Sequence, residues 1–118
     1  MTKKVYFLST CDTCKRIMKE VNVDDTFELQ DIKTAPINKE QLEQLHAHTN
    51  SYEALFNKRA RKYKELGLKE QLKEDADFKQ PILDEYTFLK RPVFVIGDDI
   101  FVGNAAKTVA AIKTKLEQ

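Results

Sequence analysis

A cysteine pair, Cys11-Asp12-Thr13-Cys14, stands between an apolar run and a helical pattern near the start of the chain. The run Val5–Leu8 has no polar position, which predicts a buried central strand. Downstream of Cys11, four apolar residues repeat at helical spacing: Cys14, Ile17, Met18 and Val21. The sequence therefore predicts a strand that runs into a helix, with Cys11 at the turn between them.

Such a turn favours a thiolate at Cys11. The free backbone N–H groups and the positive end of the helix dipole stabilise an anion there. The dipole contributes only about 0.3–1 kcal/mol, so a nearby cation is also needed for Cys11 to be mostly ionised at neutral pH. Cys11 and Cys14 are the chain's two cysteines. Thiol chemistry at Cys11 is the leading hypothesis, and an inert thiol in a turn is the alternative.

The composition is that of an ordinary soluble protein. The 118 residues predict a single domain over 1–118, and the net charge of +1 gives no general attraction to nucleic acid or to an anionic membrane. No apolar stretch approaches the roughly 20 residues that cross a bilayer, and residues 1–4 lead into the first strand with neither a long h-region nor a small-residue cleavage site. We expect a cytoplasmic protein with no direct nucleic-acid or membrane partner. In that compartment a C-x-x-C pair is more often catalytic, redox-sensing or metal-binding than structural.

The order of the remaining elements predicts an α/β fold. Phe27–Gln30 alternates as a second strand does, which completes a βαβ unit with a parallel strand pair. Near the end of the chain, Pro92 opens the strand 93–96, residues 97–99 form a turn, and 100–102 return as the hairpin partner. A last helix follows. The predicted architecture is βαβ, a helical insertion over about 37–90, then ββα, with a mixed four-stranded sheet flanked by helices.

Several helix boundaries are also predicted. Asn38 is expected to cap a helix together with Gln41, and Asn50 with Glu53 repeats that pattern. Asn104 is expected to cap the last helix, and Pro81 to begin one. The mostly charged stretch 69–77 predicts an exposed connection.

The chain resembles the arsenate reductase (ArsC), Spx and YffB family, which has a thioredoxin-like fold, along nearly its whole length. Four motifs carry the resemblance, and they occur in the family's order. They are Ser9-Thr10-Cys11-Asp12-Thr13-Cys14-Lys15, Asn57-Lys58-Arg59 ahead of Tyr63-Lys64-Glu65-Leu66-Gly67-Leu68, Lys90-Arg91-Pro92-Val93, and Phe101-Val102-Gly103-Asn104.

The resemblance implies a function and a set of roles. It makes Cys11 the nucleophile that attacks an oxyanion or a disulfide, and Arg59 and Arg91 the cations that hold and neutralise the anion. Lys15, beside the helix start, is expected to assist, and Pro92 is expected to follow a cis peptide bond. Glutathione with glutaredoxin, or thioredoxin, would supply electrons, and no cofactor other than such a thiol is implied.

The resemblance also leaves a second function open. Arsenate reductases place an arginine before the last helix, where this chain has Val102-Gly103-Asn104, as the Spx and YffB proteins do. The alternative is therefore a Spx-like redox-sensing transcription regulator that binds RNA polymerase, with the C-x-x-C pair as its switch. In either function Cys14 is a resolving thiol for Cys11 or, more simply, a small core residue.

The sequence offers two other kinds of site, a metal site and a basic contact surface. A zinc site needs about four ligands, and beyond the cysteines the only histidines are His46 and His48, whose i, i+2 spacing does not share a helix face; we therefore predict no metal site. The basic run 58–64 is either a nucleic-acid or polymerase contact or a solvated face with one arginine turned into the active site. The near-neutral net charge favours the solvated face.

Overall fold

The computed structural model describes residues 2–118, which divide into two compact units. We call residues 2–35 with 91–118 the sheet unit, and residues 36–90 the helical unit. Both cysteines, Arg91 and Pro92 belong to the sheet unit, and Arg59 belongs to the helical unit. The single-domain organisation stays a prediction. None of the helices within residues 2–118 is both long and apolar enough to cross a membrane.

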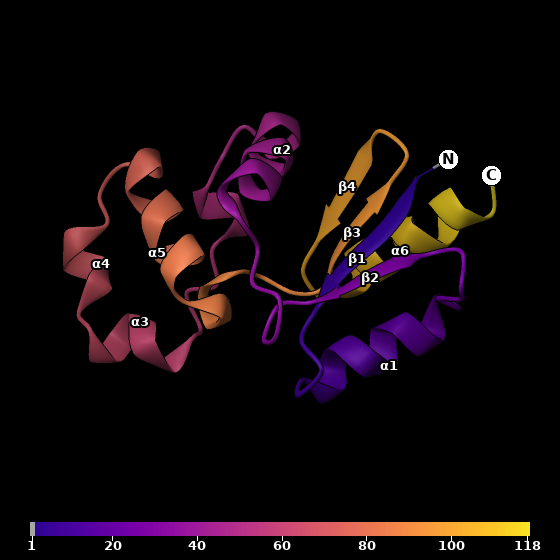
Figure 1. Cartoon of the computed structure of the whole chain (residues 1–118), viewed down its shortest axis with the longest axis horizontal. Helices are drawn as coiled ribbons and strands as arrows, with labels where there is room; N and C mark the ends of the chain where they lie inside the picture. The colour runs from indigo at the N-terminus through magenta and orange to yellow at the C-terminus, as the bar shows by residue number, and fades with distance from the viewer. Residues whose placement is uncertain (1) are drawn as a thin grey trace. The chain divides into compact units, whose positions relative to one another are not determined.

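The sheet unit contains the predicted mixed four-stranded sheet with two helices (Figure 1). The strand order is β2-β1-β3-β4, in which β1 and β2 are parallel and the other two pairs are antiparallel. The prediction of a βαβ unit followed by ββα is therefore confirmed. The elements are β1 Lys3–Phe7, α1 Asp12–Glu20, β2 Glu28–Asp31, β3 Val93–Ile96, β4 Asp99–Val102 and α6 Ala106–Leu116.

One face of the sheet carries the core of this unit. Val5 lies opposite Phe94 in the β1–β3 ladder, and neither side chain is exposed. Helices α1 and α6 both pack on this face, through Ile17 and Ile112 among others. The Phe27 ring meets the Phe94 ring edge-on, with centroids 6.3 Å apart. Because β1 is central and buried, it provides a rigid base for the turn that carries Cys11.

The helical unit is built from short helices. Its elements are α2 Lys39–Thr49, η1 Glu53–Leu55, α3 Arg61–Glu65, α4 Leu68–Gln71, η2 Asp75–Phe78, α5 Lys79–Asp84 and η3 Tyr86–Phe88. The predicted cap of α2 is confirmed, because Asn38 accepts the N–H of Gln41 and its own N–H donates to the Gln41 side chain. The prediction that Pro81 begins a helix is wrong by two residues, since α5 begins at Lys79.

Two other predicted caps are wrong. Asn50 ends α2 in the left-handed conformation, with φ at 56°, and does not begin the next helix. Asparagine tolerates that conformation better than most residues, which is why the same residue suits either helix end. The residue before α6 is Ala105, not Asn104, and no side chain caps this helix.

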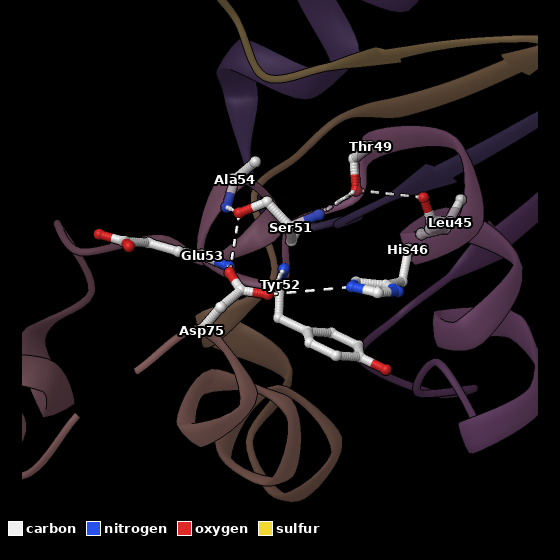
Figure 2. A network of polar contacts seen from close by, with 8 residues as sticks. All are labelled: Leu45, His46, Thr49, Ser51, Tyr52, Glu53, Ala54 and Asp75. Atoms are coloured by element: carbon white, nitrogen blue, oxygen red, sulfur yellow. Dashed lines mark hydrogen bonds and ion pairs between the residues drawn. The ribbon is translucent and has the colours of Figure 1, made fainter. Parts of the chain in front are cut away.

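The charged stretch 69–77 is mostly exposed, as predicted, although it includes the end of α4 and the start of η2. Asp75 within it holds the turn after α2 (Figure 2). The carboxylate of Asp75 accepts the N–H groups of Tyr52 and Glu53 and the hydroxyl of Ser51, at 2.9–3.0 Å. Burial alone would raise the pKa of Asp75, but these hydrogen bonds outweigh it and lower the pKa. His46 lies 3.8 Å from the same carboxylate and stacks on the Tyr52 ring.

Asp75→Ala is expected to destabilise the protein by about 1–3 kcal/mol, because it leaves the backbone N–H groups of Tyr52 and Glu53 without their acceptor. Urea unfolding of the full chain measures this change. Asp84→Ala is the matched control: the exposed Asp84 side chain accepts a bond from Gln80, and its loss should change stability by less than about 0.5 kcal/mol. Equal effects of the two substitutions would contradict the structural role of Asp75.

Candidate active site

Cys11 occupies the position that the sequence predicts, at the end of the turn from β1 into α1. It is the N-cap residue of α1, with extended backbone angles. Its N–H donates to the Leu8 carbonyl at 3.0 Å, and its carbonyl accepts the N–H of Lys15 at 3.2 Å. The turn therefore closes on both sides of Cys11, whose side chain is half-buried.

Cys14 lies one helical turn further on and is fully buried. It is the third residue of α1, so its N–H is one of the first-turn donors that a helix leaves unpaired. That N–H and the Cys14 thiol both hydrogen-bond to the sulfur of Cys11. The pair is in the free, reduced form, with both thiols in contact.

The two thiols have opposite pKa shifts. Burial alone would raise the pKa of Cys11, but the hydrogen bonds from Cys14 and the hydrogen bond and positive charge of Arg91 outweigh it and lower the pKa below its ordinary value. Burial raises the pKa of Cys14 to about 12, and the adjacent negative charge of Cys11 adds to that effect. Cys11 is thus the sulfur that ionises, and Cys14 stays a neutral donor.

Arg91 lies two residues before β3. Its side chain is half-buried and adds a positive charge beside Cys11, because the helix dipole alone is too weak to keep the thiol ionised at neutral pH. The Arg91–Pro92 peptide bond is cis, as predicted, and Pro92 is buried. The carbonyl of Pro92 accepts the N–H of Gly103 at 3.0 Å, which ties this segment to the end of β4.

The other predicted cations differ in their surroundings. Lys15 is exposed on α1, and the charge that lowers the pKa of Cys11 comes from Arg91. Arg59 is exposed in the helical unit, where its N–H donates to the Asn57 side chain at 3.0 Å. Its approach to Cys11, and the catalytic roles of all these residues, stay predictions.

Asp31 supports the site, although our sequence reasoning did not identify it. Its carboxylate, at the end of β2, accepts the N–H of Ser9 at 3.2 Å, and the Ser9 hydroxyl also bonds to it. The Ser9 hydroxyl is the main reason that the pKa of Asp31 is lowered. The signal was present in the sequence: the carboxyl ends of parallel strands meet at one edge of a sheet, so a residue ending β2 comes close to the turn after β1.

The described residues do not form a cluster of metal ligands. Within residues 2–118, no three side chains of His, Cys, Asp or Glu converge to hold a metal ion. The arrangement of a cysteine at a helix start, a second buried thiol and a neighbouring guanidinium suits nucleophilic attack by sulfur.

The chain is similar to a known family and to several solved structures over most of its length. The model of the ArsC family matches residues 6–112. The fold is similar to that of a YFFB protein, at 24% identity over 94% of this chain and 98% of that one, with a TM-score of 0.77. It is also similar to that of a Staphylococcus aureus protein, at 28% identity over 93% and 97% of the two chains, with a TM-score of 0.72.

An arsenate reductase from Vibrio cholerae has a similar fold as well, at 16% identity over 95% of this chain and 98% of that one, with a TM-score of 0.76. No curated protein sequence matches the chain.

Proposed function

This chain belongs to the ArsC family, and we propose that it is a thiol-dependent oxidoreductase in which Cys11 attacks an oxyanion or a disulfide. The observation that carries the proposal is the difference between the two thiols: the pKa of Cys11 is lowered beside Arg91, and that of Cys14 is raised to about 12. A nucleophile must be ionised before it attacks, whereas a resolving thiol reacts only after the mixed disulfide has formed. These two pKa shifts favour Cys11 as the first thiol to react and Cys14 as the second.

With a disulfide as substrate, the Cys11 thiolate attacks one sulfur, and the other sulfur leaves as a thiolate. The mixed disulfide removes the negative charge of Cys11, which is one of the causes that raise the pKa of Cys14. Cys14 then loses its proton more easily and attacks the sulfur of Cys11, which releases the second substrate thiol. The Cys11–Cys14 disulfide holds the oxidising equivalents, and glutathione with glutaredoxin, or thioredoxin, returns two electrons.

With an oxyanion such as arsenate, Cys11 forms a bond to the central atom while water leaves. In this proposal Arg91 and Arg59 neutralise the anion, Lys15 adds positive charge at the helix start, and Pro92 shapes the pocket. A thiol of glutathione or Cys14 then forms a disulfide with Cys11 as the adduct breaks, so that two electrons pass to the central atom. An assay of arsenate reduction coupled to glutathione and glutaredoxin tests this branch, and turnover that depends on Cys11 is the expected result.

Cys14→Ser is expected to preserve alkylation of Cys11 and to abolish the intramolecular disulfide. Serine keeps the N–H and offers a hydroxyl donor at the same place, so the Cys11 thiolate retains its hydrogen bonds. Mass spectrometry after mild oxidation measures the disulfide as a loss of two hydrogens in the unmodified protein and not in the variant. Disulfide turnover that persists unchanged in the variant would contradict the resolving role of Cys14.

The hydrogen bond between the two thiols also supports a second candidate, a redox-sensing regulator of the Spx kind. In that function the Cys11–Cys14 disulfide would be a signal, and RNA polymerase would be the partner. A pull-down with RNA polymerase separates the two candidates. Specific retention without arsenate or disulfide turnover would favour the regulator, and turnover without retention would favour the oxidoreductase.

A further inference from the structure

A cavity in the helical unit, apart from the residues assigned to the thiol chemistry, has the composition of an anion site. Its volume is about 370 Å³, within the range of small-molecule pockets. Its lining is three lysines, one glutamate and three side chains with apolar or aromatic surface: Glu53, Lys58, Tyr63, Lys69, Leu72, Lys73 and Phe78. These residues come from η1, α3, α4, η2 and the segments that join them, all within the helical unit.

The positive charge of the cavity is only partly neutralised. Lys58 pairs with Glu53 and lies over the Phe78 ring, 5.6 Å from its centroid. The ammonium groups of Lys69 and Lys73 are exposed and form no ion pair with any residue from 2 to 118. Two open positive charges therefore face a cavity whose one carboxylate is already engaged.

The rest of the lining is suited to an apolar group. Phe78 is buried and Leu72 is half-buried, and both line the cavity. The half-buried Tyr63 contributes an aromatic ring with a hydroxyl that donates hydrogen bonds. An occupant that uses the whole lining carries an anionic head and an apolar body.

This cavity also accounts for part of the basic run 58–64. Two lysines of the run are neutralised: Lys58 pairs with Glu53, and Lys62 pairs with Glu85 at 2.7 Å. A surface that reads a nucleic-acid backbone depends on several open cations along a stripe, and these pairs reduce that number. Arg59, Arg61 and Lys64 of the run are exposed and do not line the cavity, whose open cations are Lys69 and Lys73.

We infer that this cavity binds a small phosphate monoester that bears an apolar or aromatic group. A phosphate monoester carries about 1.5 to 2 negative charges at neutral pH, which matches the two open ammonium groups. Lysine binds phosphate as a point charge, and the Tyr63 hydroxyl adds a donor. Leu72 and Phe78 hold the apolar group. The inference goes beyond the thiol chemistry and does not depend on it.

Phenyl phosphate is the probe, and the amide shifts of the full, isotope-labelled chain are the readout. Saturable shifts at residues 69–78 are expected, and inorganic phosphate should bind more weakly because it leaves the apolar wall unused. Shifts confined to residues 11–15 would place the anion at Cys11 and overturn the inference. Equal affinity for phenyl phosphate and inorganic phosphate would also overturn it. Because the cysteine and cavity amides are read separately, failure of this site is distinguishable from failure of the thiol chemistry.

Variants make the assignment specific. The double substitution Lys69→Gln and Lys73→Gln is expected to weaken phenyl phosphate binding about tenfold, since each exposed charge contributes roughly two- to fivefold. Lys64→Gln removes an exposed lysine of α3 that does not line the cavity, and it should leave the affinity unchanged. Leu72→Ala should reduce the difference in affinity between phenyl phosphate and inorganic phosphate. Unchanged affinity in the double variant would overturn the inference.

Discussion

Cys11→Ser is expected to abolish alkylation of the protein at neutral pH, with a loss of more than about a hundredfold in labelling rate. The thiolate is the reacting species, and in this variant the one remaining thiol is Cys14. Cys14 is fully buried, and burial is the largest cause of a pKa raised to about 12. Loss of the Cys11 charge lowers that pKa somewhat, but the buried sulfur stays protonated and inaccessible. Iodoacetamide labelling followed by mass spectrometry measures the rate.

Thr10→Ser is the matched control for this substitution. It also introduces a serine into the turn between β1 and α1, at an exposed side chain with no part in the thiol pair. Labelling should proceed as in the unmodified protein. Fast labelling of Cys11→Ser would show that Cys14 is reactive, and would contradict the assignment of the nucleophile.

Arg91→Ala is expected to raise the pKa of Cys11 and to slow its alkylation at neutral pH roughly tenfold. Arg91 both donates a hydrogen bond to the Cys11 sulfur and places a positive charge beside it. The thiolate fraction of a cysteine rises with pH through its pKa. Removing the cation therefore moves the rate profile to higher pH, and the loss should be greatest below the new inflection and small at alkaline pH.

Lys15→Ala tests whether this effect is specific. Lys15 is a basic residue close to Cys11 in the sequence, but its side chain is exposed on α1 and it is screened by solvent. The change in rate should be smaller than for Arg91→Ala. An equal or larger change for Lys15→Ala would mean that the general charge of the helix start, and not the Arg91 contact, sets the reactivity of Cys11.

The sheet and the position of Cys11 were predictable because their signals are local and agree with one another. The uninterrupted apolar run at Val5 indicates a strand buried on both faces, and the strand found there, β1, is one of the two inner strands of the sheet. The turn at Gly97 separates two short apolar runs by the length of a hairpin loop, and β3 and β4 pair across it. Helical spacing after Cys11 placed Cys14 and Ile17 on the buried face of α1.

The errors fall where one residue type suits two conformations or where a partner lies far along the chain. Asn50 was assigned to the wrong helix end because asparagine serves at both. The turn that follows it is held by Asp75, 22 to 24 residues away, and no local pattern indicates that contact. Asp31 was missed for a similar reason: its hydrogen bond to Ser9 spans 22 residues and becomes visible once the strands are paired.

In the candidate site, too, some features are indicated by the sequence and others depend on tertiary packing. Cys11 was identified by its place between a strand and a helix, and Arg91 by the family resemblance. The structure adds the hydrogen bond and charge that connect them. The difference between the two thiols depends on how deeply each side chain is buried, because desolvation is the largest influence on both pKa values. Burial at that level of detail depends on tertiary packing. The sequence alone therefore indicated a reactive pair but did not separate the two pKa values.

The measurement that tests the central claim most directly is the rate of Cys11 alkylation against pH in the Cys14→Ser background, with and without arsenate. We expect an inflection below that of an ordinary cysteine, because the hydrogen bonds at the helix start and Arg91 stabilise the thiolate. Slower alkylation in the presence of arsenate would support the oxyanion branch of the proposed function, and unchanged alkylation would support the disulfide branch. An inflection at or above that of free cysteine would contradict the account.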